Sequence, residues 1–192
     1  MKKLTYFLLL LLIIISCEKK EDQDYSTLRT KATFAIPNLI SNHSFETGTQ
    51  PTLNGWTYVS GPCCADTFST DVPVGGGYYS LKLEPMWLPA EGAVETYITG
   101  LNCTKTFQLQ FDAKCVNVVS QQPYAAIYLK NGWLPAMSVV QVLNPAWTTY
   151  TLSSMNYTLT PSDTLVVRLS AGSTEVANWQ VLFDKVGLYK LP

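Results

Sequence analysis

The chain has few of the residues and motifs on which common catalytic sites depend. It contains one histidine among 192 residues, and His43 lies in an Asn-His turn where we expect a structural role, so a nucleophilic side chain has no evident base. The G-x-S-x-G, H-E-x-x-H and glycine-rich phosphate-loop motifs are absent. The sequence therefore predicts neither a hydrolase nor a lyase. Carboxylates are present without the closely spaced E-x-D-x-x-E pattern of glycosidases, the candidates being Glu84, Glu91, Glu95 and Asp112.

Charge is also scarce. Charged residues make up 14% of the chain, and the formal net charge is -1. No cluster of Lys and Arg is interleaved with aromatic residues, which predicts that the chain does not bind nucleic acid. After Ser16, no segment approaches the ~20 apolar residues of a membrane helix, and none shows a helical 3.6-residue apolar period.

The N-terminus resembles a bacterial lipoprotein signal. Two lysines precede an uncharged run from Leu4 to Ser16, which is too short to span a bilayer of about 30 Å. We expect a signal peptide over residues 1–16 and lipidation of Cys17, so that the chain is attached to a membrane. A plain cleaved signal peptide or a short anchor is the alternative.

The sequence EKKEDQD follows Cys17 and predicts a flexible tether over residues 17–32, because it has no apolar side chain to bury. Its charges also resemble the signals that direct lipoproteins to the outer face of the outer membrane. We therefore expect the chain at the cell surface, although an ordinary solvated spacer would have the same composition.

Apolar alternation predicts strands through the rest of the chain, since successive side chains of a strand point to opposite sides. Alternation is clear in Thr106–Cys115, in Tyr124–Lys130 and in Leu165–Ser170. About ten such short segments occur at the spacing of a sandwich. We predict one all-β domain over residues 33–192, a β-sandwich of two antiparallel sheets.

Two stretches at opposite ends of this domain are expected to pair. Asn38–Trp56 reads NLISNHSFETGTQPTLNGW and begins within an expected entry strand, Phe34–Ile40. Phe183–Leu191 reads FDKVGLYKL and shows strand alternation. Pairing of the two ends would close the sandwich.

These stretches also carry a family resemblance. The pattern N-L-I-x-N-x-S-F-E followed by G-W, with F-D-x-V-x-L near the C-terminus, resembles carbohydrate-binding modules of the galactose-binding-like jelly-roll type, families 4, 9 and 22. The likeness covers residues 34–191 and continues through Gly76–Pro85, Val94–Cys115 and Trp147–Leu152. It implies a jelly-roll sandwich with a concave polysaccharide-binding sheet, and a structural calcium ion that joins the N-terminal motif to the last strand. The positions that match the calcium carboxylates are Glu46 and Asp184.

Candidate sugar contacts follow from the chemistry of sugar recognition, in which aromatic rings lie under C–H faces and amides or carboxylates bind hydroxyls. Trp87 and Trp133 lie in Pro/Gly-flanked loops, where we expect ligand contact; folding back over an open end of the sandwich is the alternative. A polar strand face with Gln108, Gln110 and Asp112 is expected beside a face with Tyr124 and Tyr128, and the two together would contact a sugar. The alternative is that these residues form an ordinary solvated face of the sandwich. The remaining tryptophans are expected in the core: Trp56, Trp147 and Trp179.

Four further cysteines suggest a disulfide in an oxidising compartment. Cys103 and Cys115 lie near opposite ends of one expected strand, farther apart than the ~7 Å between Cα atoms that a bridge allows. We therefore expect at most one long-range bridge, from Cys63 or Cys64 to one of the other two. A vicinal Cys63–Cys64 bridge and a zinc site are less favoured alternatives.

Taken together, the residues and the resemblance favour non-catalytic carbohydrate binding by a lipid-anchored envelope lipoprotein, with polysaccharide as the partner. The alternative is a structural or adhesive envelope module that contacts a protein partner. Rings that line a groove would favour the first, and a flat apolar patch would favour the second.

Overall fold

The described part of the chain is built from strands alone. The computed structural model describes residues 36–59, 68–84, 86–87, 91–116, 123–130, 138–174 and 179–192, with the backbone alone for 86–87 and 173–174. Every regular element in these ranges is a strand, and among them no helix is long and apolar enough to cross a membrane. The predictions that lie outside the described residues concern the signal peptide, Cys17, the tether, Cys63, Cys64 and Trp133.

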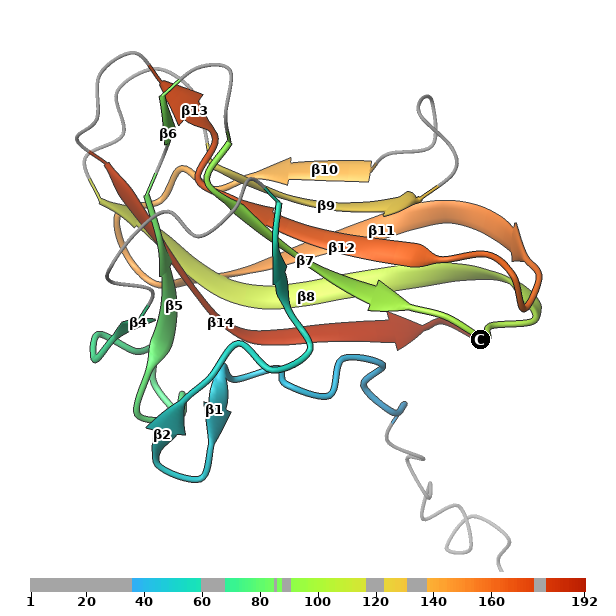
Figure 1. Cartoon of the computed structure of the whole chain (residues 1–192), viewed down its shortest axis with the longest axis horizontal. Helices are drawn as coiled ribbons and strands as arrows, with labels where there is room; N and C mark the ends of the chain where they lie inside the picture. Colours follow the sequence, from blue (N-terminus) through green and yellow to red (C-terminus); the bar gives the residue numbers. More distant parts are fainter. Residues whose placement is uncertain are drawn as a thin grey trace, which may run out of the picture. The chain divides into compact units, whose positions relative to one another are not determined.

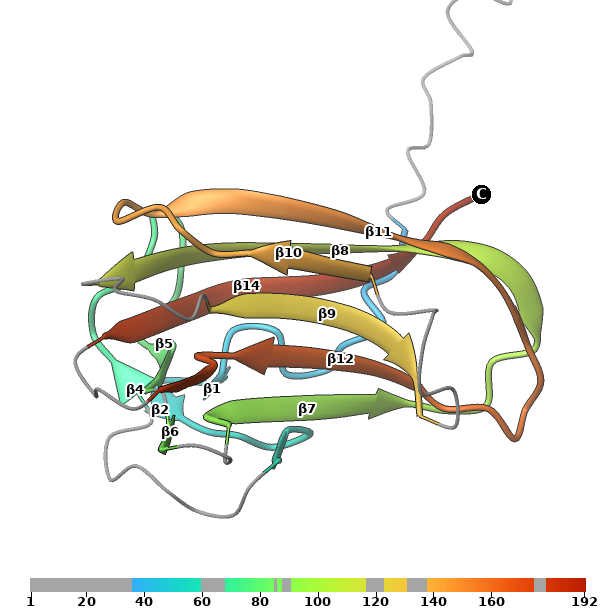
Figure 2. The same ribbon diagram turned by 90° about the horizontal axis from the view of Figure 1, so that it is seen from above.

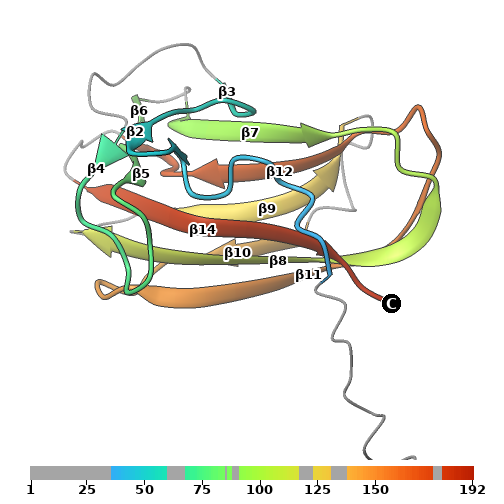
Figure 3. The ribbon, with the colours of Figure 1, turned by 90° about the horizontal axis from the view of Figure 1, so that it is seen from below.

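Two five-stranded antiparallel sheets form the two layers of the domain (Figures 1 and 2). The first, called here the β9 sheet, has the strand order β10 (Ser138–Gln141), β9 (Tyr124–Leu129), β12 (Leu165–Ser170), β7 (Ala93–Ile98) and β3 (Thr57–Tyr58). The second, the β8 sheet, has the order β11 (Thr148–Leu159), β8 (Cys103–Val116), β14 (Gln180–Lys190), β5 (Ser80–Leu83) and β4 (Phe68–Ser69). Figures 2 and 3 view these layers from above and from below. Two small pairs complete the strands: β1 (Glu46–Thr47) with β2 (Gln50–Pro51), and β13 (Ser173–Thr174) with β6 (Met86–Trp87).

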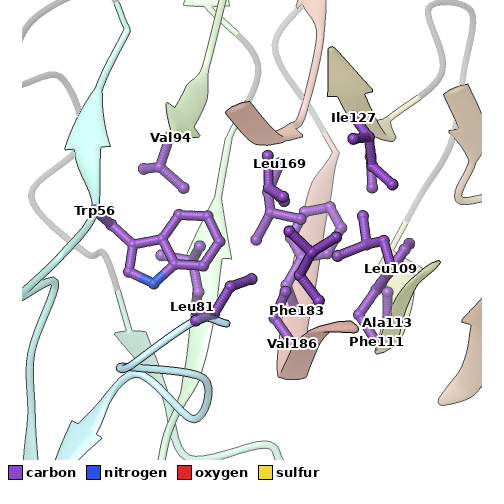
Figure 4. Close-up of a cluster of buried hydrophobic side chains, with 14 of the residues drawn as sticks. Trp56, Leu81, Val94, Leu109, Phe111, Ala113, Ile127, Leu169, Phe183 and Val186 are labelled. Carbon is purple, nitrogen blue, oxygen red and sulfur yellow. The ribbon is translucent and has the colours of Figure 1, made fainter. Parts of the chain in front are cut away.

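The alternation in the sequence matches the two sides of the longest strand. In β8, the side chains of Phe107, Leu109 and Phe111 are fully buried, whereas the intervening Gln108 and Gln110 face outward. The inward residues of both sheets meet in one hydrophobic core (Figure 4). Burying each large apolar side chain contributes roughly 1.5–3 kcal/mol, so this core is the main source of stability. It extends from Ile40 to Leu188, within the compact unit of residues 36–192.

The two ends of the domain pair as expected, although not as two strands. Residues 36–40 are irregular in backbone conformation, so the described part of the expected Phe34–Ile40 strand is not a strand. The amide of Leu39 nevertheless donates to the carbonyl of Leu188 over 2.8 Å. Asn38 anchors the segment, since its Nδ2 donates to the carbonyl of Val186 and its Oδ1 accepts from the Leu188 amide. A side chain thus replaces part of the expected backbone ladder.

Two of the three tryptophans expected in the core are found there. Trp56 and Trp179 are buried, with 6% and 2% of their surface exposed. The prediction for Trp147 was wrong, because this residue is half-buried and its Nε1 donates to Asp71 Oδ1 over 2.8 Å. Trp147 immediately precedes β11, at the position where the alternation turns its side chain outward beside Lys114.

Cys103 and Cys115 occupy β8, near its opposite ends, and both are free thiols. At most one long-range bridge was expected from Cys63 or Cys64; none is seen at Cys103 or Cys115, and Cys63 and Cys64 lie outside the described residues. Burial raises the pKa of the Cys115 thiol to about 11, so its small side chain acts as part of the apolar core.

Candidate functional site

The residues expected to form one sugar-binding face lie on two different layers. Tyr124 and Tyr128 belong to β9, whereas Gln108, Gln110 and Asp112 belong to β8 in the other sheet. β8 and β9 follow one another in the sequence, but β8 pairs with β11 and β14 while β9 pairs with β10 and β12. The expected juxtaposition was therefore wrong. Trp87 lies in β6, where only the backbone is described.

The outer face of the β9 sheet gathers a cluster of tyrosines and charged groups. Strand register sets its layout: Arg168 in β12 is paired with Glu95 in β7, and Val166 is paired with both Tyr97 and Tyr128. Tyr97 and Tyr128 therefore lie on either side of Val166, and the Arg168–Glu95 ion pair lies two residues further along β12. We call this set the Glu95 cluster, and its members are Glu91, Glu95, Tyr97, Tyr124, Tyr128, Arg168 and Ser170.

Glu95 is the centre of the hydrogen bonding in this cluster. Its side chain is only 8% exposed. The Tyr97 hydroxyl donates to Oε2 over 2.6 Å, the Tyr128 hydroxyl donates to Oε1, and Arg168 Nε also donates to Oε1 over 2.7 Å. Both tyrosine rings are therefore fixed at their hydroxyl ends.

Glu91 extends the same network toward the start of β7. Arg168 Nη1 lies 3.0 Å from Glu91 Oε2, and the Ser170 hydroxyl donates to Glu91 Oε1 over 2.5 Å. Arg168 therefore bridges two carboxylates that lie four residues apart in the sequence. The set therefore has two acidic groups for one basic group.

Protonation in the cluster follows from its contacts. Burial of Glu95 favours the neutral acid, but the hydrogen bonds from Tyr128, Tyr97 and Arg168 outweigh it and lower the pKa of Glu95. The bond to Glu95, helped by burial, raises the pKa of Tyr97 to about 12. Burial and the bond to Glu95 also raise the pKa of Tyr128, and burial and hydrogen bonding to Glu91 raise that of Tyr124. The carboxylate of Glu95 stays ionised and the tyrosines stay neutral.

The tyrosine rings also contact cations. The ammonium of Lys130 lies 4.7 Å from the Tyr97 ring centroid, and the Arg168 guanidinium carbon lies 5.5 Å from that of Tyr128. Tyr97 remains 40% exposed. The face thus offers a held aromatic ring next to a dense set of hydrogen-bonding groups, which is the combination that an amphipathic sugar requires.

Sequence reasoning found only part of the Glu95 cluster. Tyr124 and Tyr128 were expected. Glu91 and Glu95 were considered only as two of four candidate glycosidase carboxylates, and Tyr97 and Arg168 were missed. A signal existed in LVVRLS, where a single arginine interrupts an otherwise apolar strand and so requires an ionic partner. The partner could not be read from the sequence, because Glu95 precedes Arg168 by 73 residues.

The outer face of the β8 sheet carries the other expected residues. Gln110 is exposed, and Gln108 is half-buried. Asp112 is occupied by its neighbours, since it accepts from the Thr149 hydroxyl over 2.5 Å and lies 3.2 Å from Lys185 Nζ. This face is polar and separate from the Glu95 cluster.

Glu46 and Asp184, the carboxylates that match a calcium site, are close enough to interact. Asp184 is fully buried, and its Oδ2 has no hydrogen-bond partner among the described residues. Burial, together with the nearby charges of Glu46 and Asp112, raises the pKa of Asp184 to about 6. A bound cation would favour the ionised form of this carboxylate and lower its pKa again.

The backbone around this acid pair is held close to the carboxylates. A Cβ on Gly76 would lie 2.5 Å from Asp184 Oδ2, and one on Gly77 would overlap the Glu46 carboxylate. Two non-glycine residues adjacent to the pair, Phe45 and Lys185, have positive φ angles of 58° and 51°. No described group of three or more His, Cys, Asp or Glu side chains gathers here, so backbone carbonyls would supply further ligands. The oxygen donors and the orphaned Oδ2 fit a calcium ion.

Two antiparallel layers, closed by pairing between the N-terminal motif and the last strand, define a jelly-roll sandwich of the galactose-binding-like type. Residues 37–176 match the family described as carbohydrate binding domain, CBM_4_9, and the chain belongs to this family. No curated protein is significantly similar to the chain.

Solved structures show the same fold at low sequence identity. The CBM22-1 xylan-binding domain of Paenibacillus barcinonensis Xyn10C is 20% identical, with a TM-score of 0.52 over 81% of this chain and 96% of that one. TmCBM61 in complex with β-1,4-galactotriose is 12% identical, with a TM-score of 0.51 over 81% of this chain and 99% of that one. The arabinose-bound α-L-arabinofuranosidase MgGH51 is 18% identical, with a TM-score of 0.58 over 81% of this chain and 26% of that larger one.

Proposed function

We propose that the Glu95 cluster is the carbohydrate-binding face of this domain and that it binds a polysaccharide without cleaving it. The observation that carries the proposal is the fixing of the Tyr97 and Tyr128 hydroxyls by the single carboxylate of Glu95. Rings held in this way lose little conformational entropy on binding. The hydroxyl and guanidinium groups around them can bind sugar hydroxyls while the exposed Tyr97 ring contacts C–H groups.

The bonding of the two glutamates supports binding rather than hydrolysis. A glycosidase needs one carboxyl group with a raised pKa to protonate the leaving group. Arg168 instead contacts both Glu91 and Glu95, and the pKa of Glu95 is lowered. Glu95 is therefore not suited to act as the acid, and Glu91 is held in an ion pair with Arg168.

We further propose that the domain is attached to the outer membrane through lipidated Cys17 and is displayed at the cell surface. The support is the sequence of residues 1–32, in which a basic start, a short apolar run and a cysteine precede a charged tether. A tether of about fifteen residues would let the domain move relative to the membrane and reach extended glycans.

A glycan screen tests the binding proposal. The chain without residues 1–24 retains the whole described core and is compared with its Tyr97→Ala and Tyr78→Ala variants. We expect the parent to bind at least one polysaccharide and Tyr97→Ala to bind it at least tenfold more weakly, because one ring contact is lost. Tyr78→Ala, which removes a 62% exposed tyrosine elsewhere, should bind like the parent. Absence of binding by the parent, or equal binding by Tyr97→Ala, would overturn the proposal.

We also propose that Glu46 and Asp184 hold a structural calcium ion. Calcium would supply the positive charge that the buried Asp184 carboxylate lacks and would tie the N-terminal motif to β14. Its role would be to stabilise the fold, because Glu46 in β1 and Asp184 in β14 are not part of the Glu95 cluster.

Gly77→Ala tests the calcium proposal. The added Cβ would displace the Glu46 carboxylate, which also accepts a hydrogen bond from the Tyr79 amide. We expect calcium affinity, measured by calorimetry, to fall at least tenfold, while the melting temperature in EDTA changes little. Unchanged calcium affinity, or no calcium binding by the parent, would contradict the assignment.

A further inference from the structure

We propose that the outer face of the β8 sheet is a second carbohydrate-contact face, so that the domain can hold two glycan chains at once, one on each layer. This inference rests on the proposed function of the Glu95 cluster and extends it from a single-site module to a bridging one. The set of residues, called here the β8 face, comprises Gln108, Gln110, Trp147, Thr151, Ser153 and Tyr189.

The Tyr189 side chain of the β8 face folds back over the neighbouring Gly187 backbone. A Cβ on Gly187 would lie 2.6 Å from both Cε2 and Cζ of Tyr189, so the tyrosine ring covers the Gly187 backbone. Gly187 is paired with Gln110, and Tyr189 is paired with Gln108. The ring therefore lies along the strand with an amide beside it at each of two positions. An aromatic ring held over an exposed sheet face is the kind of group that contacts the C–H groups of a sugar.

The polar groups around this ring are available to a ligand. Gln110, Thr151 and Ser153 are exposed, and register pairs Gln110 with Thr151 and Gln108 with Ser153. Among the residues that the structure describes, these four side chains and Tyr189 make no hydrogen bond with one another or with the rest of the protein. The amides and hydroxyls provide both donors and acceptors, as a polyhydroxylated ligand needs.

Two lysines on the outer side of this layer are paired with acids of the protein. Lys114 is paired with Asp71, and Lys185 with Asp112. The residues of the β8 face themselves carry no charge, which favours an uncharged glycan over a uronate or a sulfated chain.

Trp147 marks the far end of the β8 face. Its indole N–H is fixed by Asp71, and the Lys114 ammonium lies 5.7 Å from its ring centroid. Lys114 and Gln108 are six positions apart on one strand, which corresponds to about 20 Å along the sheet. A glycan chain that runs along β8 could contact Trp147 at one end and Tyr189 at the other.

The two faces point away from each other because they are the outer sides of opposite layers, as Figures 2 and 3 show from above and from below. One ligand chain cannot lie along both. Two occupied faces would make the domain a noncovalent cross-link between glycan chains, with a gain in avidity on a multivalent surface.

Titration calorimetry separates this proposal from the proposed function of the Glu95 cluster. The probes are β-1,4-linked hexaoses of glucose, xylose and galactose, added to the chain without residues 1–24. The parent is compared with Tyr97→Ala, Tyr189→Ala and the double variant, and Gln110→Ala provides a second substitution that leaves the ring in place. Circular dichroism and thermal melting of each variant establish that the fold is retained.

We expect two equivalents of hexaose per parent molecule, one per single tyrosine variant, and none for the double variant. Gln110→Ala should weaken one of the two sites at least fivefold. A single equivalent that Tyr97→Ala removes and Tyr189→Ala leaves intact would overturn the second face while supporting the first. If the parent binds a single equivalent and only Tyr189→Ala removes it, both the bridging proposal and the assignment of the Glu95 cluster are overturned. Absence of hexaose binding by the parent would also overturn both.

Discussion

Replacing Arg168 by alanine is expected to lower the free energy of unfolding by about 3–5 kcal/mol, because removing one partner of a buried ion pair leaves the other charge uncompensated. The Glu95 side chain is 8% exposed and that of Arg168 is 22% exposed, so water can compensate only in part. Urea denaturation at neutral pH measures the change.

The pH dependence of the Arg168→Ala defect identifies its cause. Without the guanidinium, the pKa of Glu95 should rise above its value in the unfolded chain, so protonation would relieve the defect. The loss of stability should therefore be largest at neutral pH and should shrink as the pH falls through the raised pKa. Lys130→Ala removes an exposed cation from the same face and should cost less than about 0.5 kcal/mol. A loss below about 1 kcal/mol for Arg168→Ala, or one that does not vary with pH, would contradict the account.

The calcium-free protein should lose stability through Asp184 as the pH rises. The pKa of this acid is raised to about 6 from a usual value of 3.8. Its stabilising contribution is therefore fully present below pH 3.8 and is lost as the pH rises through about 6. The shift corresponds to roughly 3 kcal/mol between these limits. Calcium should restore the loss at neutral pH, because the ion favours the ionised carboxylate.

Comparison with Asp184→Asn isolates this contribution, since other carboxylates such as Glu95 and Asp71 have lowered pKa values and act in the opposite direction. In EDTA, the stability of the parent relative to Asp184→Asn should fall from pH 4 to pH 7. Added calcium should stabilise the parent and leave the variant unchanged. A constant difference between the two proteins across this range, measured by denaturant unfolding, would show that Asp184 does not titrate as inferred.

The sequence was sufficient to predict most of the strands and most of the core. Period-two alternation placed Phe107, Leu109 and Phe111 inside, and this prediction is confirmed. The family resemblance predicted the jelly-roll sandwich, which is also confirmed. Both succeed because alternation and motif order are local properties of the chain.

The composition of the binding faces could not be predicted in the same way. The Glu95–Arg168 pair depends on the register between β7 and β12, and the separation of Gln110 from Tyr128 depends on which sheet each strand joins. Neither is encoded in the spacing of residues along the chain. The prediction that Trp147 lies in the core was wrong for a related reason. Its outward orientation follows from its position next to the first β11–β8 pair, Thr148 with Ala113.

The most direct test of the central claim is to map a bound glycan by NMR. The chain without residues 1–24 would be titrated with the hexaose that it binds most tightly. Backbone amide shifts should change in β7, β9 and β12 around Tyr97, Tyr128 and Arg168, and they should saturate with the calorimetric affinity. Saturable shifts that spare all three strands would contradict the assignment of the Glu95 cluster as the carbohydrate-binding face.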